Sequence, residues 1–350
     1  MATTASLDHV DQIDHSARFR FGVLFATGSA LSFGMSGPLA KSLMVAGWSP
    51  TAAVLARLAG GALVLAIVAT IVKPDWFGQA RTHARLVVAY GLIPVAGAQL
   101  CYYNAVSRLS VGVALLLEYT APVLVIAWVW ATTRRRPRTL TLLGVALAVI
   151  GLTLVLDVLS GARVDAIGVA WGLGAAVCAV CYFMMSDQVT ADGSGLHALT
   201  LAAGSLMVAT LGVTALGLTG VMPLRFTAND AVIGDLTVSW LVPVALLGVV
   251  ATALAYVLGI SGVARLRPSF ASLMGLAEVL FAVVIAWLVL DERVTTTQAV
   301  GGIVVLVGLA LARRGESQAA TEISDGTTAK SVAADTRIGV VRRNLSESTP

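Results

Sequence analysis

Residues 108–130 read RLSVGVALLLEYTAPVLVIAWVW, and residues 265–287 read RLRPSFASLMGLAEVLFAVVIAW. The two stretches align without a gap at an offset of 157 residues. The matched residues that are least expected by chance are Arg108 with Arg265, Trp130 with Trp287, Gly144 with Gly301 and Gly151 with Gly308. At the start of each half, Gly28 aligns with Gly174 at the shorter offset of 146 residues. The chain therefore consists of two similar halves that form an internal repeat.

The composition around these stretches is that of a membrane protein. Hydrophobic residues make up 57% of the 350 residues and charged residues 12%, and the mean hydropathy is +0.88. A soluble domain carries about a quarter charged residues. The net charge of +4 does not indicate nucleic-acid binding, because the basic residues are scattered between apolar runs.

The apolar runs are long enough to cross a bilayer, which takes roughly 20 residues of helix. Ten such runs predict an all-α integral membrane protein with ten transmembrane helices. The expected spans are 21–43, 50–71, 85–106, 109–131, 139–157, 167–187, 197–219, 240–261, 268–290 and 297–313. The longest connection, 220–239, has room for a small external loop.

Basic residues in the connections predict the orientation, since Lys and Arg are retained on the cytoplasmic side. Thirteen lie on one set of alternate connections: Arg18, Arg20, Lys73, Arg81, Arg85, Arg134, Arg135, Arg136, Arg138, Arg265, Arg267, Arg313 and Arg314. Five lie on the other: Lys41, Arg108, Arg163, Arg225 and Arg293. We therefore expect both termini in the cytoplasm and the chain in the cell (inner or plasma) membrane.

These observations divide the chain into four parts. They are a cytoplasmic N-terminal tail (1–20), a first repeat of five helices (21–157), a second repeat of five helices (158–314) and a disordered cytoplasmic tail (315–350). Because five is an odd number, the second repeat enters the membrane from the opposite side. Such inverted repeats are typical of secondary transporters, in which a site between the halves opens to either side in turn.

The sequence resembles the drug/metabolite transporter superfamily, in its ten-helix branch of two EamA repeats. The residues that carry the resemblance are Ala277-Glu278-Val279-Leu280-Phe281-Ala282 in the ninth span, Leu290-Asp291-Glu292-Arg293-Val294-Thr295 after it, and Gln298, Gly301 and Gly308. Val279 stands where the family usually has Pro. The stretches Gly37-Pro38-Leu39-Ala40-Lys41 and Val113 to Pro122 are similar to those of threonine and homoserine exporters. The resemblance implies a secondary transporter of small metabolites that exports amino acids or related compounds.

Two carboxylates lie near the middle of predicted spans, where an ionisable side chain is costly and usually faces a bundle interior or cavity. Glu118 and Glu278 each lie roughly 14 to 15 Å deep at a rise of 1.5 Å per residue. In the repeat register Ala121 aligns with Glu278, so the two acids are displaced by three positions and share a helix face. Each is a candidate for contact with an ammonium group or for proton exchange, or else a structural hydrogen-bond partner.

Arg57, in the second span, is expected at a similar depth to Glu118. A structural ion pair between them is one interpretation, and binding of a substrate carboxylate is the alternative. Tyr119, Tyr103 and Asn104 are further candidates for the substrate pathway. Lys41 belongs to the exporter-like stretch, but we expect it to extend to the membrane interface.

The motifs of enzymes, metal sites and ATPases are absent from the sequence. It has no His-Glu-x-x-His, no Gly-x-Ser-x-Gly and no phosphate-binding Gly-x-x-x-x-Gly-Lys-Ser/Thr run. We therefore expect no enzyme activity, no cofactor and no metal, and partners limited to a small-molecule substrate and the lipid bilayer, with protons as the default coupling ion. The alternatives are a non-transporting scaffold or receptor, and a substrate class of drugs or other metabolites. The sequence does not predict an oligomeric state.

Overall fold

The computed structural model describes residues 20–134, 136–156, 165–191, 196–263, 268–312 and 314. Almost all of these residues are helical. The two predicted polar tails, 1–20 and 315–350, lie outside the described residues, apart from Arg20.

The chain begins with a helical stretch at residues 20–34 and ends with the helix Thr296–Ala312. Between them the elements are α2 Ser36–Val45, α3 Pro50–Val72, α4 Trp76–Thr82, α5 Ala84–Tyr90, η1 Gly91–Gly97, α6 Ala98–Val106, α7 Val111–Glu118, α8 Ala121–Thr133, α9 Thr139–Val155, α10 Ala166–Ala191, α11 Ala198–Leu218, β1 Ala231–Ile233, β2 Leu236–Val238, α12 Leu241–Ala245, η3 Leu246–Leu254, α13 Ala255–Val263 and α14 Pro268–Leu290.

Within the described residues, six helical segments are long and apolar enough to cross a membrane. They are Arg20–Val45, Pro50–Val72, Ala84–Val106, Val111–Thr132, Ala198–Leu218 and Leu241–Gly262. Four shorter apolar helices are Thr139–Val155, Ala166–Tyr182, Ala277–Leu290 and Thr296–Ala312, at the positions of the other four predicted spans. The six long segments make this a multi-pass membrane protein.

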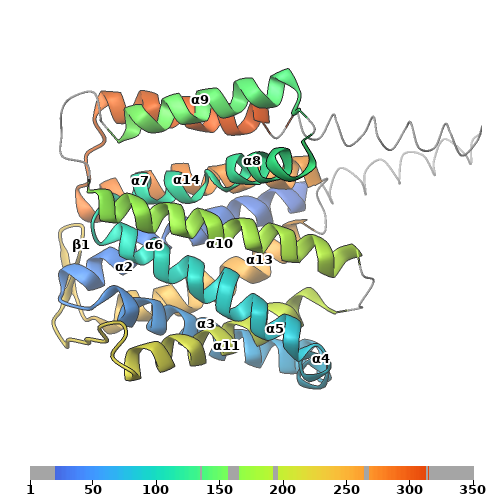
Figure 1. Cartoon of the computed structure of the whole chain (residues 1–350). Coiled ribbons are helices and arrows are strands. Elements are labelled where there is room, and N and C mark those ends of the chain that lie inside the picture. Colours follow the sequence, from blue (N-terminus) through green and yellow to red (C-terminus); the bar gives the residue numbers. More distant parts are fainter. Residues whose placement is uncertain are drawn as a thin grey trace, which may run out of the picture.

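The helices lie side by side in a bundle, with β1 at one end and α4 at the other (Figure 1). The β-strands form an antiparallel hairpin in which Ala231 pairs with Val238, inside the connection predicted to form an external loop. This connection packs on the turn between α2 and α3, where Trp48 contacts Phe226 with 5.1 Å between ring centroids. The Trp48 indole N–H also donates to the Thr227 carbonyl oxygen at 2.9 Å.

Local sequence signals start two of the spans. Ser49 precedes α3, and its hydroxyl accepts a hydrogen bond from the Ala52 N–H at 3.2 Å. Pro50 follows as the first helical residue, where its missing N–H costs nothing. Ser110 caps α7 in the same way by accepting from the Val113 N–H at 3.4 Å. Serine satisfies N–H groups that have no partner within the first turn.

Helix α9 and the last helix, Thr296–Ala312, pack against each other through glycines (Figure 1). A Cβ at Gly144 would lie 2.6 Å from the Gly308 carbonyl oxygen, and one at Gly151 would lie 2.7 Å from the Gly301 carbonyl oxygen. These are the glycines that match at the 157-residue offset. Gly144 aligns with Gly301 but contacts Gly308, and Gly151 aligns with Gly308 but contacts Gly301. Such reciprocal packing is expected around a two-fold axis.

The third and eighth spans share a backbone irregularity. Each contains a π-helical segment, η1 in the third span and η3 in the eighth. Both segments pack against a helix from the other half of the chain, η1 on α11 and η3 on α3. Single turns of π-helix occur frequently at functional sites, and η3 is the segment that contacts Arg57.

Candidate functional site

Arg57 lies on α3 with 4% of its surface exposed, and its hydrogen-bond partners among the described residues are all neutral. Its Nη1 donates to the Ser36 hydroxyl and the Gln99 side-chain oxygen. Its Nε donates to the Thr252 hydroxyl at 3.1 Å, and its Nη2 has a longer contact of 3.4 Å with the Ala251 carbonyl oxygen. A buried guanidinium held only by neutral groups is costly, because no protein charge compensates it directly.

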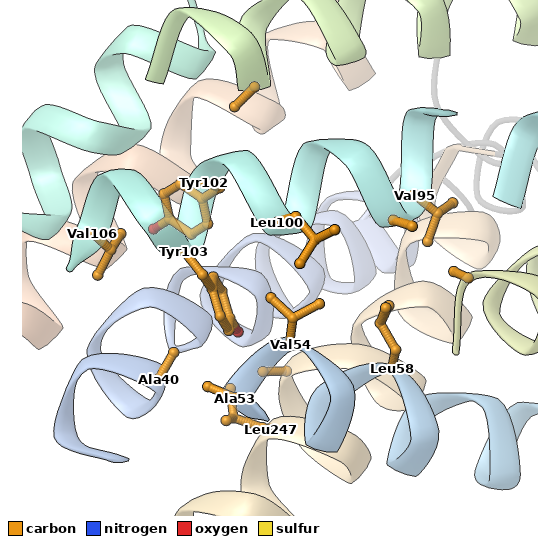
Figure 2. Close-up of a cluster of buried hydrophobic side chains, with 14 of the residues drawn as sticks. Ala40, Ala53, Val54, Leu58, Val95, Leu100, Tyr102, Tyr103, Val106 and Leu247 are labelled. Atoms are coloured by element: carbon orange, nitrogen blue, oxygen red, sulfur yellow. The ribbon is translucent and has the colours of Figure 1, made fainter. Parts of the chain in front are cut away.

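Tyr103 completes this cluster from α6. Its side chain is fully buried and reaches from α6 towards Ala53 and Val54 of α3 (Figure 2). The hydroxyl lies 3.0 Å from the Ser36 hydroxyl, and the ring lies 5.9 Å from the Arg57 guanidinium carbon. The prediction that Tyr103 belongs to a central site remains a proposal, and the structure brings it next to Arg57.

The two predicted carboxylates have different surroundings. Glu278, on α14, accepts a hydrogen bond from the Tyr119 hydroxyl at 2.8 Å. Glu118 is the last residue of α7, and its carboxylate makes no hydrogen bond or ion pair with any residue that the structure describes. Both side chains are partly buried. Glu278 is thus oriented by a neighbouring side chain, whereas the Glu118 carboxylate is not held by any residue that the structure describes.

The structure corrects one interpretation of Arg57. The sequence favoured a structural ion pair between Arg57 and Glu118, but within the described residues no carboxylate lies within 4.0 Å of the guanidinium. Arg57, Glu118 and Glu278 nevertheless lie within electrostatic range of one another. The cluster therefore combines one base with two acids, none of them joined in a direct ion pair.

The expectation that Lys41 extends to the membrane interface stays a prediction, and the structure gives its side chain two partners. Its ammonium group forms an ion pair with Glu292, which follows α14, and the two side chains are 23% and 18% exposed. The Lys41 ammonium also donates to the Leu109 carbonyl oxygen at 2.9 Å, and the other Glu292 oxygen accepts from the Val111 N–H at 3.0 Å. Glu292 was not predicted as the partner of Lys41, because it lies 251 residues away in the sequence.

The last predicted residue, Asn104, is not part of the central cluster. Its side-chain amide donates to the Leu100 carbonyl oxygen one turn earlier in the same helix at 2.7 Å. Sequence reasoning also missed Ser36, Thr252 and Glu292. Ser and Thr are common in membrane helices, and only the Asp-Glu-Arg turn after the ninth span gave any signal for Glu292.

No group of three or more metal-ligating side chains is found within the described ranges. The three cysteines are free thiols, and Cys101 on α6 lies next to Cys178 on α10. The chemistry of the site is thus that of charged and hydroxyl side chains between packed helices.

Comparison with known proteins defines the class. The model of the EamA-like transporter family matches residues 20–157 and again residues 166–314, here called the first and second matched segments. This chain therefore belongs to the EamA-like transporter family. It is a multi-pass membrane transporter.

The curated relatives include threonine/homoserine exporters RhtA. The protein from Escherichia coli strain K12 is 30% identical over 287 residues, which cover 80% of this chain and 88% of that one. The protein from Salmonella typhimurium strain LT2 is 30% identical over 266 residues, covering 75% and 80% of the two chains. A solved crystal structure with 19% identity and a TM-score of 0.54 covers 83% of this chain and 96% of its own. That likeness concerns the fold alone.

Proposed function

We propose that this chain is a secondary transporter that exports amino acids or closely related small metabolites from the cell. The observation that carries the proposal is the set of charges between the matched segments. Arg57 lacks an ionic partner in the described structure, and the carboxylates of Glu118 and Glu278 lie in its electrostatic range. An amino acid carries the complementary charges, a carboxylate for the guanidinium and an ammonium group for a carboxylate. The names of the curated relatives point to the same substrate class.

The proposed architecture is ten membrane helices in two inverted repeats of five, with both termini in the cytoplasm. The four shorter apolar helices supply the count beyond six. The reciprocal packing of α9 with Thr296–Ala312 supports the two-fold relation. The distribution of basic residues in the connections supports the orientation.

Charge counting supports protons as the coupling ion. One guanidinium can balance one carboxylate, so the second acid of the cluster is cheaper to bury with a proton bound. Glu118 is the better candidate for this proton, because it lacks the hydrogen bond that Tyr119 gives to Glu278. The substrate and the proton then bind alternately or together during the cycle.

The test is efflux from proteoliposomes loaded with radiolabelled solutes. The panel contains L-threonine, L-homoserine, other amino acids and a lipophilic cation as a drug-like probe, each with and without a pH gradient. We expect amino-acid efflux that rises with an inward proton gradient. If only the cation is transported, the substrate class is drugs rather than amino acids. If no solute is transported, a scaffold or receptor is favoured.

A matched pair of variants addresses the coupling. Glu118→Gln is expected to abolish the dependence of efflux on the pH gradient. Asp235→Asn makes the same chemical change at an exposed position of the hairpin turn and is expected to leave it intact. Equal gradient dependence in the two variants would contradict a role for Glu118 in proton coupling.

A further inference from the structure

The two edges of the Arg57 guanidinium are held by different parts of the chain. Nη1 donates to Ser36 and Gln99, both in the first matched segment like Arg57 itself. Nε and Nη2 face Thr252 and Ala251 in the second matched segment. Arg57 is thus fixed from one side by its own segment and capped from the other side by the opposite one.

The contacts of Arg57 with Thr252 and Ala251, here called the cap, are weaker than its contacts with Ser36 and Gln99. Arginine has five N–H donors, and Nη2 has only a contact of 3.4 Å with the Ala251 carbonyl oxygen. The Thr252 hydroxyl accepts from Nε while donating to the Leu247 carbonyl oxygen at 2.8 Å, within the π-helical segment η3. Neither capping group carries a charge. A carboxylate would bind this edge more strongly, because Nε and Nη2 match its two oxygens in a planar, bidentate geometry.

The cap also lies at the contact between the two matched segments. Gly60 and Gly248 approach so closely that a Cβ at Gly60 would lie 2.8 Å from the Gly248 Cα. Any conformation that separates α3 from η3 removes Thr252 and Ala251 from Arg57. The contacts with Ser36, Gln99 and Tyr103 do not depend on η3, because those residues lie in the first matched segment, like α3 itself. The separation therefore exposes an oriented guanidinium edge.

We infer that the Nε–Nη2 edge of Arg57 is the binding site for the carboxylate of the transported solute, and that Thr252 and Ala251 of η3 occupy this edge in the solute-free, closed state. The inference rests on the proposed transport function and specifies its substrate class as carboxylate-bearing solutes. It also makes Thr252 a competitor of the substrate. Solute binding and separation of α3 from η3 are then coupled, because the carboxylate and the cap exclude each other.

The test compares two probes that differ only at the carboxylate, L-threonine and L-threonine amide. Binding to the purified, full-length protein in detergent is measured by competition, with the size-exclusion profile as the check on folding. The wild-type protein is expected to bind L-threonine at least tenfold more tightly than the amide. Arg57→Lys keeps the charge but loses the planar pair of N–H donors, and we expect this ratio to fall by about tenfold. A purely structural role would weaken both probes equally and leave the ratio unchanged.

Thr252 provides the second arm. Thr252→Val removes the capping hydroxyl at nearly constant volume, and we expect it to tighten L-threonine binding by about fivefold, the value of one neutral hydrogen bond. Thr252→Ser keeps the hydroxyl and should bind like the wild type. Unchanged or weaker binding in Thr252→Val would overturn the competition between cap and substrate.

The outcomes separate this inference from the transport function. If the wild-type protein binds carboxylates with the expected ratio but moves none of them in proteoliposomes, export fails and the carboxylate site stands. If it transports solutes but binds the acid no better than the amide, or binds neither probe, the carboxylate site is overturned.

Discussion

The segments that carry Glu118 and Glu278 have the same register in the repeat but different backbones. The first is broken, because α7 ends at Glu118 and α8 begins at Ala121. The second, α14, is continuous from Pro268 to Leu290. The residue aligned with Pro122 at the 157-residue offset is Val279. Proline has no N–H to donate to the carbonyl four residues earlier, here that of Glu118, whereas valine continues the helix.

This difference places two similar acids in different settings. Glu118 lies at a helix end without a hydrogen bond to its carboxylate from the described residues. Glu278 lies inside a continuous helix and accepts from Tyr119, which is itself in the break of the other segment. In the repeat register the two acids are offset by three positions, and the helix break at Pro122 gives Glu118 different surroundings from Glu278.

The largest effect is expected when the proline is moved from the broken segment to the continuous one. Val279→Pro removes a hydrogen bond inside α14 at a position that is 2% exposed, and we expect a loss of about 3 kcal/mol or more in the free energy of unfolding. Thermal unfolding in detergent measures it. The mirror change Pro122→Val restores a donor to the broken segment and is expected to leave stability unchanged or raised. Similar losses in both variants would show that the two backbones do not differ for this reason.

The hydrogen bond between the two segments is the next test. Tyr119→Phe leaves the Glu278 carboxylate without its hydroxyl donor, and we expect a cost of about 1 to 3 kcal/mol. The control is Tyr256→Phe, because Tyr256 packs edge-on against Phe33 at 5.3 Å between centroids and has no hydrogen bond to a described residue. In a double-mutant cycle, Tyr119→Phe should cost little once Glu278→Gln is present. Additive effects would refute direct coupling.

The ion pair between Lys41 and Glu292 joins α2 to the segment that follows α14. Lys41→Met leaves a partly buried carboxylate without its cation, and we expect a loss of about 1 to 2 kcal/mol, between the values for exposed and buried pairs. Adding Glu292→Gln should recover most of it, as measured by the unfolding midpoint. No recovery in the double variant would mean that packing of the lysine stem, not its charge, matters here.

The smallest effect is expected just before α7, where Arg108 Nη1 lies 3.4 Å from the Asp165 carboxylate. The backbone N–H of Gly168 and the Arg108 guanidinium lower the pKa of Asp165. The stabilising contribution of Asp165 is therefore present above its unfolded pKa and is lost as the pH falls through its folded pKa. Asp165→Asn should remove this acid dependence of the unfolding midpoint. At neutral pH it should shift the midpoint less than Lys41→Met.

Several features were predictable because they depend on local chemistry. The apolar runs gave the positions of the membrane helices, and Ser49 and Ser110 mark helix starts by a serine before the first turn. The location of Glu118 and Glu278 inside helical segments followed from the apolar runs around them. The partners of Arg57 and Lys41 were not predictable in this way, because Thr252 and Glu292 lie far along the chain.

The sequence by itself determined the membrane class, the two-fold repeat and the acids within the spans, since hydrophobicity, periodicity and charge are properties of the residues in order. Only the tertiary structure decided which charges are compensated. Lys41 meets a carboxylate and Arg57 meets hydroxyl and carbonyl oxygens, because electrostatic pairing depends on distance across helices. The 157-residue match predicted that the two stretches correspond. Packing decided that Glu278 accepts a hydrogen bond from Tyr119, whereas Glu118 receives none from the described residues.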